Sequence, residues 1–199
     1  MIKEKFLMTT EQYGKDHTFI YTDASKNKER VGFGICIPSI EYNFSSRLPG
    51  ALSISKAESI AIHQAVEIAT AKHLNKAIIF SDSLNAITNI KTCNISASAD
   101  IRALKTKKLI SSANENGTKI LLSWIPGHSN IFGNTQADIL AKIGRDLNVP
   151  MEVQLNSQDA LSVIRGKITK EYQEKWKARM PSQSSEEKLH KCTKKNGNF

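Results

Sequence analysis

The sequence predicts an α/β protein built on one mixed five-stranded sheet with helices on both faces. Three short strand-like segments follow one another early in the chain with tight connections, which indicates an antiparallel meander. Two further short apolar segments then alternate with amphipathic helical stretches, a pattern typical of mixed α/β folds. The 199 residues are enough for one domain of about 150 residues with an appendage.

The meander follows a polar stretch, residues 1–17, that we expect to be a loosely ordered lead-in. Its first strand is predicted at Thr18–Asp23. Two further strands are predicted at Val31–Pro38 and Glu41–Leu48, joined by a short turn at Pro38-Ser39.

The second half of the predicted domain begins with an amphipathic helix at Ser55–His73, along which apolar residues recur at helical spacing. Ser55 and Glu58 have the spacing of a capping box at its start. The remaining predicted elements are the strand Lys76–Ser81, the helix Ser83–Thr92, a polar linker Cys93–Ser98, the helix Ala99–Glu115, the strand Thr118–Ile125 and the helix Ile131–Asp146.

Beyond Pro150 we predict a further amphipathic helix at Gln158–Lys177. We interpret its apolar stripe as a packing surface rather than a recognition surface; the stripe consists of Ala160, Leu161, Ile164 and Ile168. The chain therefore divides into a lead-in at 1–17, an α/β domain at 18–147, a helical extension at 148–178 and a basic, disordered tail at 179–199.

The chain is basic, with a formal net charge of +9 and a pI near 9.5. From Arg165 onward ten basic residues face only four acidic ones, so this stretch holds six of the nine excess charges. Lysine and arginine neutralise phosphates and release counterions. The charge and its distribution therefore favour nucleic acid as the partner.

The three cysteines, Cys36, Cys93 and Cys192, are widely spaced and form no CxxC pair, which indicates a reducing compartment. No apolar run reaches the roughly 18 residues of a membrane span. The start of the chain does not resemble a secretory signal. We expect an intracellular protein of the cytoplasm or nucleus, a monomer without membrane attachment.

Four carboxylates, Asp23, Glu58, Asp82 and Asp138, lie within or directly after apolar segments. Burying a lone ionised carboxylate costs several kcal/mol or more, so such groups are normally paired, protonated or bound to metal. No matching buried Lys or Arg is predicted beside them, so a hard divalent cation is the expected partner. Asp23 and Asp82 also follow two strands, at the edge where sites form in parallel sheets.

Most of these acids also have a purely structural interpretation. Glu58 can close the capping box with Ser55, and Asp82 can cap the helix that follows it. Asp23 can be a turn residue, whereas Asp138 gains nothing from its place inside a helix. The four together favour a metal cluster.

His128 lies in the loop between the last predicted strand and the helix that carries Asp138. A loop histidine is more often a solvated surface group than a catalyst. This loop is expected to open toward the fourth acid, which favours a role in proton transfer.

Five short motifs follow one another along two-thirds of the chain, and although each alone is uninformative, the ordered set is specific. They are Tyr21-Thr22-Asp23-Ala24-Ser25, Lys56-Ala57-Glu58, Ser81-Asp82-Ser83, Trp124-Ile125-Pro126-Gly127-His128 and Gly133-Asn134-Thr135-Gln136-Ala137-Asp138. With them the chain resembles type 1 ribonuclease H, most closely the ribonuclease H domains of non-LTR retrotransposon reverse transcriptases. Ala24 departs from the commonest family motif, which has glycine there.

The resemblance implies a ribonuclease H-like fold and endonucleolytic hydrolysis of the RNA strand of RNA·DNA hybrids. It implies that Asp23, Glu58, Asp82 and Asp138 are catalytic metal ligands and that His128 is a mobile catalytic histidine. We expect two Mg²⁺ ions, replaceable by Mn²⁺, roughly 4 Å apart and sharing Asp23. One ion would activate the attacking water and the other would stabilise the leaving 3′ oxygen.

Substrate contacts are expected at Ser25, Ser55 and Asn134, the last two to 2′-hydroxyl groups that mark the RNA strand. Binding is expected to be sensitive to salt and indifferent to sequence. We also expect the chain to be part of a larger reverse-transcriptase polyprotein.

Three alternatives stay open on the sequence alone. A proofreading-type exonuclease needs an acid two residues after Asp23, where Ser25 stands. A transposase or integrase of the same fold lacks a recognisable target-DNA module after Asp138. The third is a catalytically inactive ribonuclease H-like domain with a binding or structural role, which the intact carboxylates disfavour.

Overall fold

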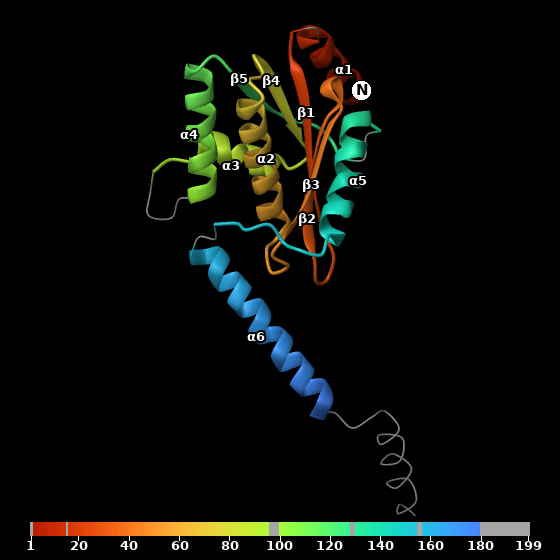
Figure 1. Cartoon of the computed structure of the whole chain (residues 1–199), viewed down its shortest axis with the longest axis vertical. Coiled ribbons are helices and arrows are strands. Elements are labelled where there is room, and N and C mark those ends of the chain that lie inside the picture. Colours follow the sequence, from red (N-terminus) through yellow and green to blue (C-terminus); the bar gives the residue numbers. More distant parts are fainter. Residues whose placement is uncertain (1, 15, 96–99, 128–129, 155–156, 180–199) are drawn as a thin grey trace, which may run out of the picture.

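The structure is a computed structural model that describes residues 2–14, 16–95, 100–127, 130–154 and 157–179. An α/β domain is built around one sheet, and a long helix projects from one end of it (Figure 1). In chain order the elements are α1 (Ile2–Tyr13), β1 (Thr18–Lys26), β2 (Val31–Ile37), the 3₁₀ turn η1 (Pro38–Ile40), β3 (Tyr42–Leu48), α2 (Ile54–Ala71), β4 (Lys76–Ser81), α3 (Leu84–Thr92), α4 (Ile101–Glu115), β5 (Lys119–Trp124), α5 (Phe132–Asp146) and α6 (Ser157–Arg179).

The five strands form one sheet in the order β3-β2-β1-β4-β5. β1 pairs antiparallel with β2, and β2 pairs antiparallel with β3, which is the predicted meander. β1 pairs parallel with β4, and β4 pairs parallel with β5. The mixed five-stranded sheet predicted from the sequence is confirmed.

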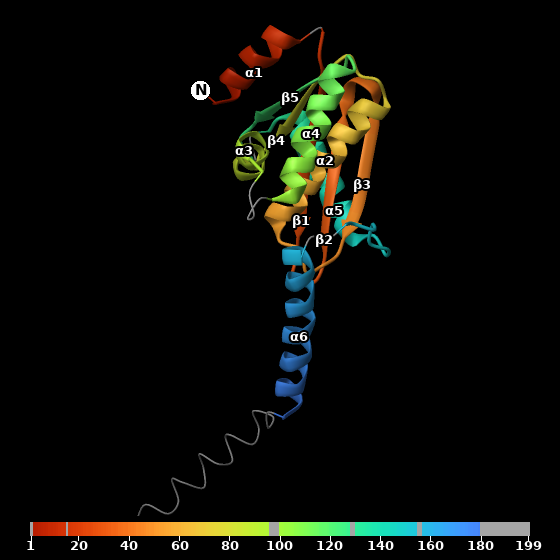
Figure 2. The ribbon, with the colours of Figure 1, turned by 90° about the vertical axis from the view of Figure 1, so that its left-hand side faces the viewer.

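Helices cover both faces of the sheet, with α2, α3 and α4 on one side and α5 on the other (Figures 1 and 2). Successive strand residues point to opposite faces, so each central strand serves two cores. Ile20 and Ile79 belong to the core beneath α2, whereas Tyr21 and Phe80 belong to the core beneath α5. The central strands β1 and β4 are thus covered on both faces.

Two local expectations near the start of elements are wrong. The lead-in contains the helix α1. Its polar sequence does not predict a helix, because the helix is stabilised by a tertiary contact: the Phe6 ring packs edge-on against Phe80 at 5.3 Å between centroids. The predicted capping box is absent, because α2 begins earlier than expected. Its N-cap is Ser53, whose side chain accepts a hydrogen bond from Lys56 N at 3.2 Å.

Helix α5 lies directly on the backbone of β2, because this strand has glycines where side chains would face the helix. A Cβ on Gly34 would overlap the backbone nitrogen of Ala141 and the carbonyl oxygen of Ala137. A Cβ on Gly32 would likewise overlap the backbone of Arg145. This close approach brings the middle of α5, and with it the fourth predicted acid, toward β1.

The segment 147–154 returns from α5 to the outer strand β3. Pro150 forms a parallel bridge with Arg47, and Met151 N donates a hydrogen bond to Arg47 O at 2.8 Å. The Arg47 guanidinium donates in turn to Asn148 O at 2.7 Å. Met151 and Val153 then pack against the main hydrophobic core. This segment therefore adds to the packing of the α/β domain.

Helix α6 projects away from the domain in both views (Figures 1 and 2). Its apolar stripe is half exposed, with Leu161 and Ile164 each at 52% and Ile168 at 49%. The packing that we inferred for this stripe is therefore not present within the described part of the chain. The predicted tail lies almost wholly at 180–199, outside the described residues.

The packing of α5 on β2 gives a stability prediction. Gly34→Ala should destabilise the domain by roughly 3 kcal/mol or more in urea unfolding, because the added methyl must push α5 off the strand. Gly117→Ala is the control, since Gly117 has open space around it but a φ of +93°. It should cost about 1 kcal/mol from backbone strain alone. Equal losses in the two variants would contradict the close-packing argument.

Candidate active site

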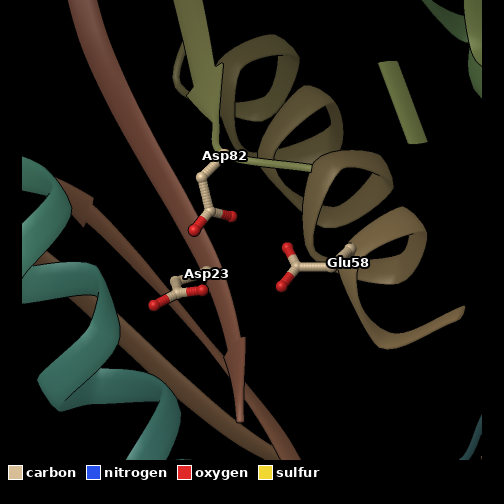
Figure 3. A group of neighbouring side chains, drawn as sticks. All are labelled: Asp23, Glu58 and Asp82. Carbon is tan, nitrogen blue, oxygen red and sulfur yellow. The ribbon is translucent and has the colours of Figure 1, made fainter. Parts of the chain in front are cut away.

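Three of the four predicted acids, Asp23, Glu58 and Asp82, converge at one edge of the sheet (Figure 3). One carboxylate oxygen from each lies within 4.8 Å of the others. They come from β1, from α2 and from the residue directly after β4. Side chains far apart in the sequence thus form one cluster of negative oxygens.

Strand register brings Asp23 and Asp82 together. The parallel pairing of β1 with β4 ends with Thr22 opposite Ser81, and the next residue on each side is an aspartate. β1 itself continues to Lys26 as a partner of β2, so Asp23 lies inside this strand rather than at its end. Only the pairing of β1 with β4 ends before Asp23, at Thr22.

Asp82 is not the cap of the following helix. The N-cap of α3 is Ser83, whose side chain accepts from Ala86 N. The backbone carbonyl of Asp82 accepts a hydrogen bond from the Trp124 indole at 3.0 Å, which holds this turn against the end of β5. Gly127 also lies close: a Cβ there would come within 2.8 Å of Asp82 Oδ2. The interpretation of Asp82 as the cap of α3 is therefore wrong.

Glu58 points from α2 into the cluster and is only 5% exposed. Its Oε1 accepts a hydrogen bond from the backbone N–H of Ala24 at 3.0 Å, and the same N–H donates to Asp23 Oδ1 at 2.8 Å. Glu58 Oε2 is buried and has no hydrogen-bond partner among the described residues. One amide thus orients two acids and leaves a buried carboxylate oxygen without a donor.

Burial and mutual repulsion raise the pKa values of these acids. The pKa of Asp23 rises from 3.8 to about 7, first because of burial and second because of the negative charge of Asp82. The pKa of Glu58 rises well above its usual value of 4.5, again because of burial and then because of Asp23 and Asp82. A positive charge at the centre would relieve both effects. Three carboxylates with an unsatisfied buried oxygen fit a hard divalent cation.

Asp138 lies near the cluster but outside the group of three. Its charge contributes to the raised pKa of Asp23, so the two interact electrostatically. Its Oδ2 accepts from the Lys142 ammonium at 2.7 Å, one turn further along α5. Asp138 therefore has a cationic partner, but Lys142 is 54% exposed, so the expectation that no buried Lys or Arg pairs with these acids is not contradicted. The spacing of four residues could have revealed this pair from the sequence.

The expected substrate residues have different environments. Ser55 is exposed in the first turn of α2, and the Ser25 hydroxyl accepts from the Arg145 guanidinium at 3.1 Å. Asn134 is only 6% exposed, and its Oδ1 has no partner among the described residues. Its role as a substrate contact stays a prediction. His128 lies outside the described residues, so its role stays a prediction.

The sheet order, the helices on both faces and the converging acids together define a class of α/β proteins, those with a carboxylate site at the ends of parallel strands.

Residues 15–146 match the family model described as RNase H, so the chain belongs to the RNase H family. Human Ribonuclease H1 is 30% identical over 149 residues, which cover 68% of this chain and 52% of that protein. Mouse Ribonuclease H1 is 28% identical over the same length. The chain spans about half the length of these curated relatives.

Solved structures share the fold at low sequence identity. The foamy viral protease-reverse transcriptase in complex with dsDNA matches with a TM-score of 0.54 and 20% identity, covering 66% of this chain and 96% of that one. RNase H1 from the halophilic archaeon Halobacterium salinarum matches with a TM-score of 0.51 and 14% identity, covering 64% and 96%. Within the described residues, no helix is both long and apolar enough to cross a membrane.

The raised pKa of Asp23 predicts an unusual dependence of stability on pH. The folded state retains a proton between pH 3.8 and about 7 that the unfolded state has lost. Stability of the metal-free protein should therefore fall as the pH rises through this window, by on the order of 4 kcal/mol from this group. Asp23→Asn cannot titrate and should remove that fall.

Urea unfolding in chelator at several pH values measures this effect as the difference between the two proteins, which cancels the titrating groups that do not interact with Asp23. Parallel profiles for the natural chain and Asp23→Asn would show that Asp23 keeps an ordinary pKa in the fold.

Proposed function

We propose that this chain hydrolyses the RNA strand of RNA·DNA hybrids by internal cuts that depend on divalent cations. The observation that carries the proposal is the convergence of Asp23, Glu58 and Asp82 around a buried, unsatisfied carboxylate oxygen. Membership of the RNase H family supports the reaction class.

Asp23, Glu58 and Asp82 would hold one divalent cation, with Mg²⁺ as the expected ion and Mn²⁺ as a substitute. Such an ion supplies Lewis acidity, which activates water at neutral pH and stabilises negative charge on a leaving oxygen. Asp138 would serve a second ion, and the Lys142 ammonium at its Oδ2 would compete with that ion. The two-ion arrangement thus stays a prediction, supported by the proximity of Asp138 to Asp23.

The remaining contacts position these acids before any substrate binds. The Ala24 N–H fixes the carboxylates of Asp23 and Glu58 relative to each other. The hydrogen bond from Trp124 to the carbonyl of Asp82 fixes the third. Ligands held in this way lose little conformational freedom on binding a cation, which favours catalysis. The N–H of Ala24 does this as well as that of the usual glycine would.

An RNA·DNA hybrid as the substrate agrees with the charge of the chain, which has a formal net value of +9. Ser55 lies exposed one turn before Glu58 on α2, so it is our candidate for a contact to a 2′-hydroxyl group. Ser25 already accepts from Arg145, so a substrate contact there would have to share its hydroxyl. Binding should weaken steeply with salt.

We also propose that the chain derives from a reverse transcriptase of a non-LTR retrotransposon. The ordered motifs from Tyr21 to Asp138 support this origin. The foamy viral protease-reverse transcriptase, a larger protein, contains the same fold. The finer assignment stays a prediction.

Activity on a labelled hybrid tests the proposed reaction. With Mg²⁺ the chain should produce internal RNA cuts with 5′-phosphate ends, and Asp82→Asn should lower the rate at least a hundredfold while leaving the fold intact, because one ligand loses its charge. Asp16→Asn is the matched control, since the Asp16 side chain is 74% exposed and remote from the cluster. Normal cutting by Asp82→Asn would falsify the proposed site.

Cation binding can be tested without catalysis. Millimolar Mn²⁺ should raise the melting temperature, because the ion binds only the folded cluster. Glu58→Gln should melt higher than the natural chain in chelator, since one buried negative charge is gone, and should lose most of the Mn²⁺ effect. Glu152→Gln, which alters an exposed glutamate, should behave like the natural chain. An unchanged Mn²⁺ shift in Glu58→Gln would count against the cation site.

A further inference from the structure

Among its described side chains, helix α6 contacts the α/β domain along one side. Gly166 lies against Ala51, since a Cβ on Gly166 would come within 3.3 Å of the Ala51 Cβ. Lys170, one turn further on, forms an ion pair with Glu29 at 3.6 Å. Both contacts lie on the same side of the helix, at the end of the domain from which α6 projects (Figures 1 and 2).

The opposite side of α6 combines arginines with exposed aromatic rings. At about 100° per residue, Arg165, Tyr172 and Arg179 recur every seven residues and lie within about 20° of one line. Leu161 also lies within about 20° of this line, and Ile168 and Trp176 flank it. Tyr172 is 72% exposed, Trp176 is 66% exposed and Leu161 is 52% exposed. We call these six residues the outer face of α6.

Charge on α6 is unevenly distributed around the helix. Glu171 and Glu174 lie about 100° to 160° from the line through Tyr172, so the outer face contains no acid. Lys175 lies at its border. A shallow hollow of about 680 Å³ beside the rings is lined by Ile168, Thr169, Tyr172, Gln173, Trp176 and Lys177. The face thus presents flat rings bordered by positive charge.

We propose that the outer face of α6 binds an unpaired nucleic-acid strand, RNA or DNA. Exposed aromatic rings stack on bases that are free of a partner strand, and every base offers such a face. Arg165 and Arg179 lie on either side of the rings, where they can contact the phosphates between stacked bases. Large exposed aromatic side chains grouped on one face indicate that this face binds a partner molecule.

A second copy of the chain fits this face less well. Two outer faces packed together would place Arg165 and Arg179 of each copy among like charges, with no acid on the face to neutralise them. The phosphates of a nucleic acid supply the missing negative charge. Charge complementarity therefore favours an unpaired nucleic-acid strand, rather than a second copy of the chain, as the partner of the outer face.

The domain side of α6 lies near the end of β1, the strand that carries Asp23. β1 ends at Lys26, whose ammonium donates to the Leu52 carbonyl at 2.6 Å, and the neighbouring Ala51 contacts α6. Three residues of strand, roughly 10 Å, separate Lys26 from Asp23. A single strand that continues beyond a hybrid at the acids can therefore reach α6. This relation to a hybrid rests on the proposed function, whereas strand binding by α6 does not.

Fluorescence anisotropy with the full chain tests the proposal in chelator, so that no hydrolysis is needed. The probes are labelled oligomers of about twenty deoxythymidines or uridines at low salt. Both should bind, and Tyr172→Ala/Trp176→Ala should weaken binding roughly tenfold or more. Arg165→Gln and Lys170→Gln remove the same charge from opposite sides of α6, and only Arg165→Gln should weaken binding by several-fold.

Several results would overturn the proposal. One is equal weakening by Arg165→Gln and Lys170→Gln, which would mean that total charge and not this face binds the strand. Another is unchanged binding in the double aromatic variant. A dimer in sedimentation that disappears in that variant would assign the face to a second copy. Asp82→Asn should bind the oligomers normally, so loss of hydrolysis and loss of strand binding are separate outcomes.

Discussion

The parallel pairing of β1 with β4 is the constraint on which the candidate site depends. The register places Thr22 opposite Ser81, so that the chain delivers Asp23 and Asp82 to the same edge of the sheet. Backbone hydrogen bonds stabilise this register. The rings of Tyr21 and Phe80, one residue before Thr22 and Ser81, also stack across the two strands at 5.3 Å between centroids. Two carboxylates that would separate in a flexible loop are thereby held close together.

The cost of this arrangement is electrostatic and falls unequally on the four acids. Asp23, Glu58 and Asp82 share a small space, and one backbone amide partly compensates the charge of two of them. Asp138 has its own counterion in Lys142. A positive charge would therefore stabilise the cluster of Asp23, Glu58 and Asp82 strongly and would stabilise Asp138 less. Sites under such strain are typical of function rather than of stability.

Much of this site could be predicted from local sequence. An acid that follows an apolar segment or interrupts an apolar stripe is visible without coordinates, and so is the order of the strands in the meander. The burial of Asn134 could not be predicted, because it follows from how closely α5 approaches the sheet over the glycines of β2. The helix α1 was missed for a similar reason, since its Phe6 gains its partner, Phe80, only in the folded chain.

The return of segment 147–154 to β3 has a consequence for how the protein behaves in a crowded solution. β3 is an outer strand, and outer strands with free backbone groups invite pairing with other chains. The bridge between Arg47 and Pro150 occupies part of that border, and proline has no N–H with which to extend a ladder. The same few residues that join α5 to α6 thus shield part of this edge of the sheet from edge-to-edge aggregation.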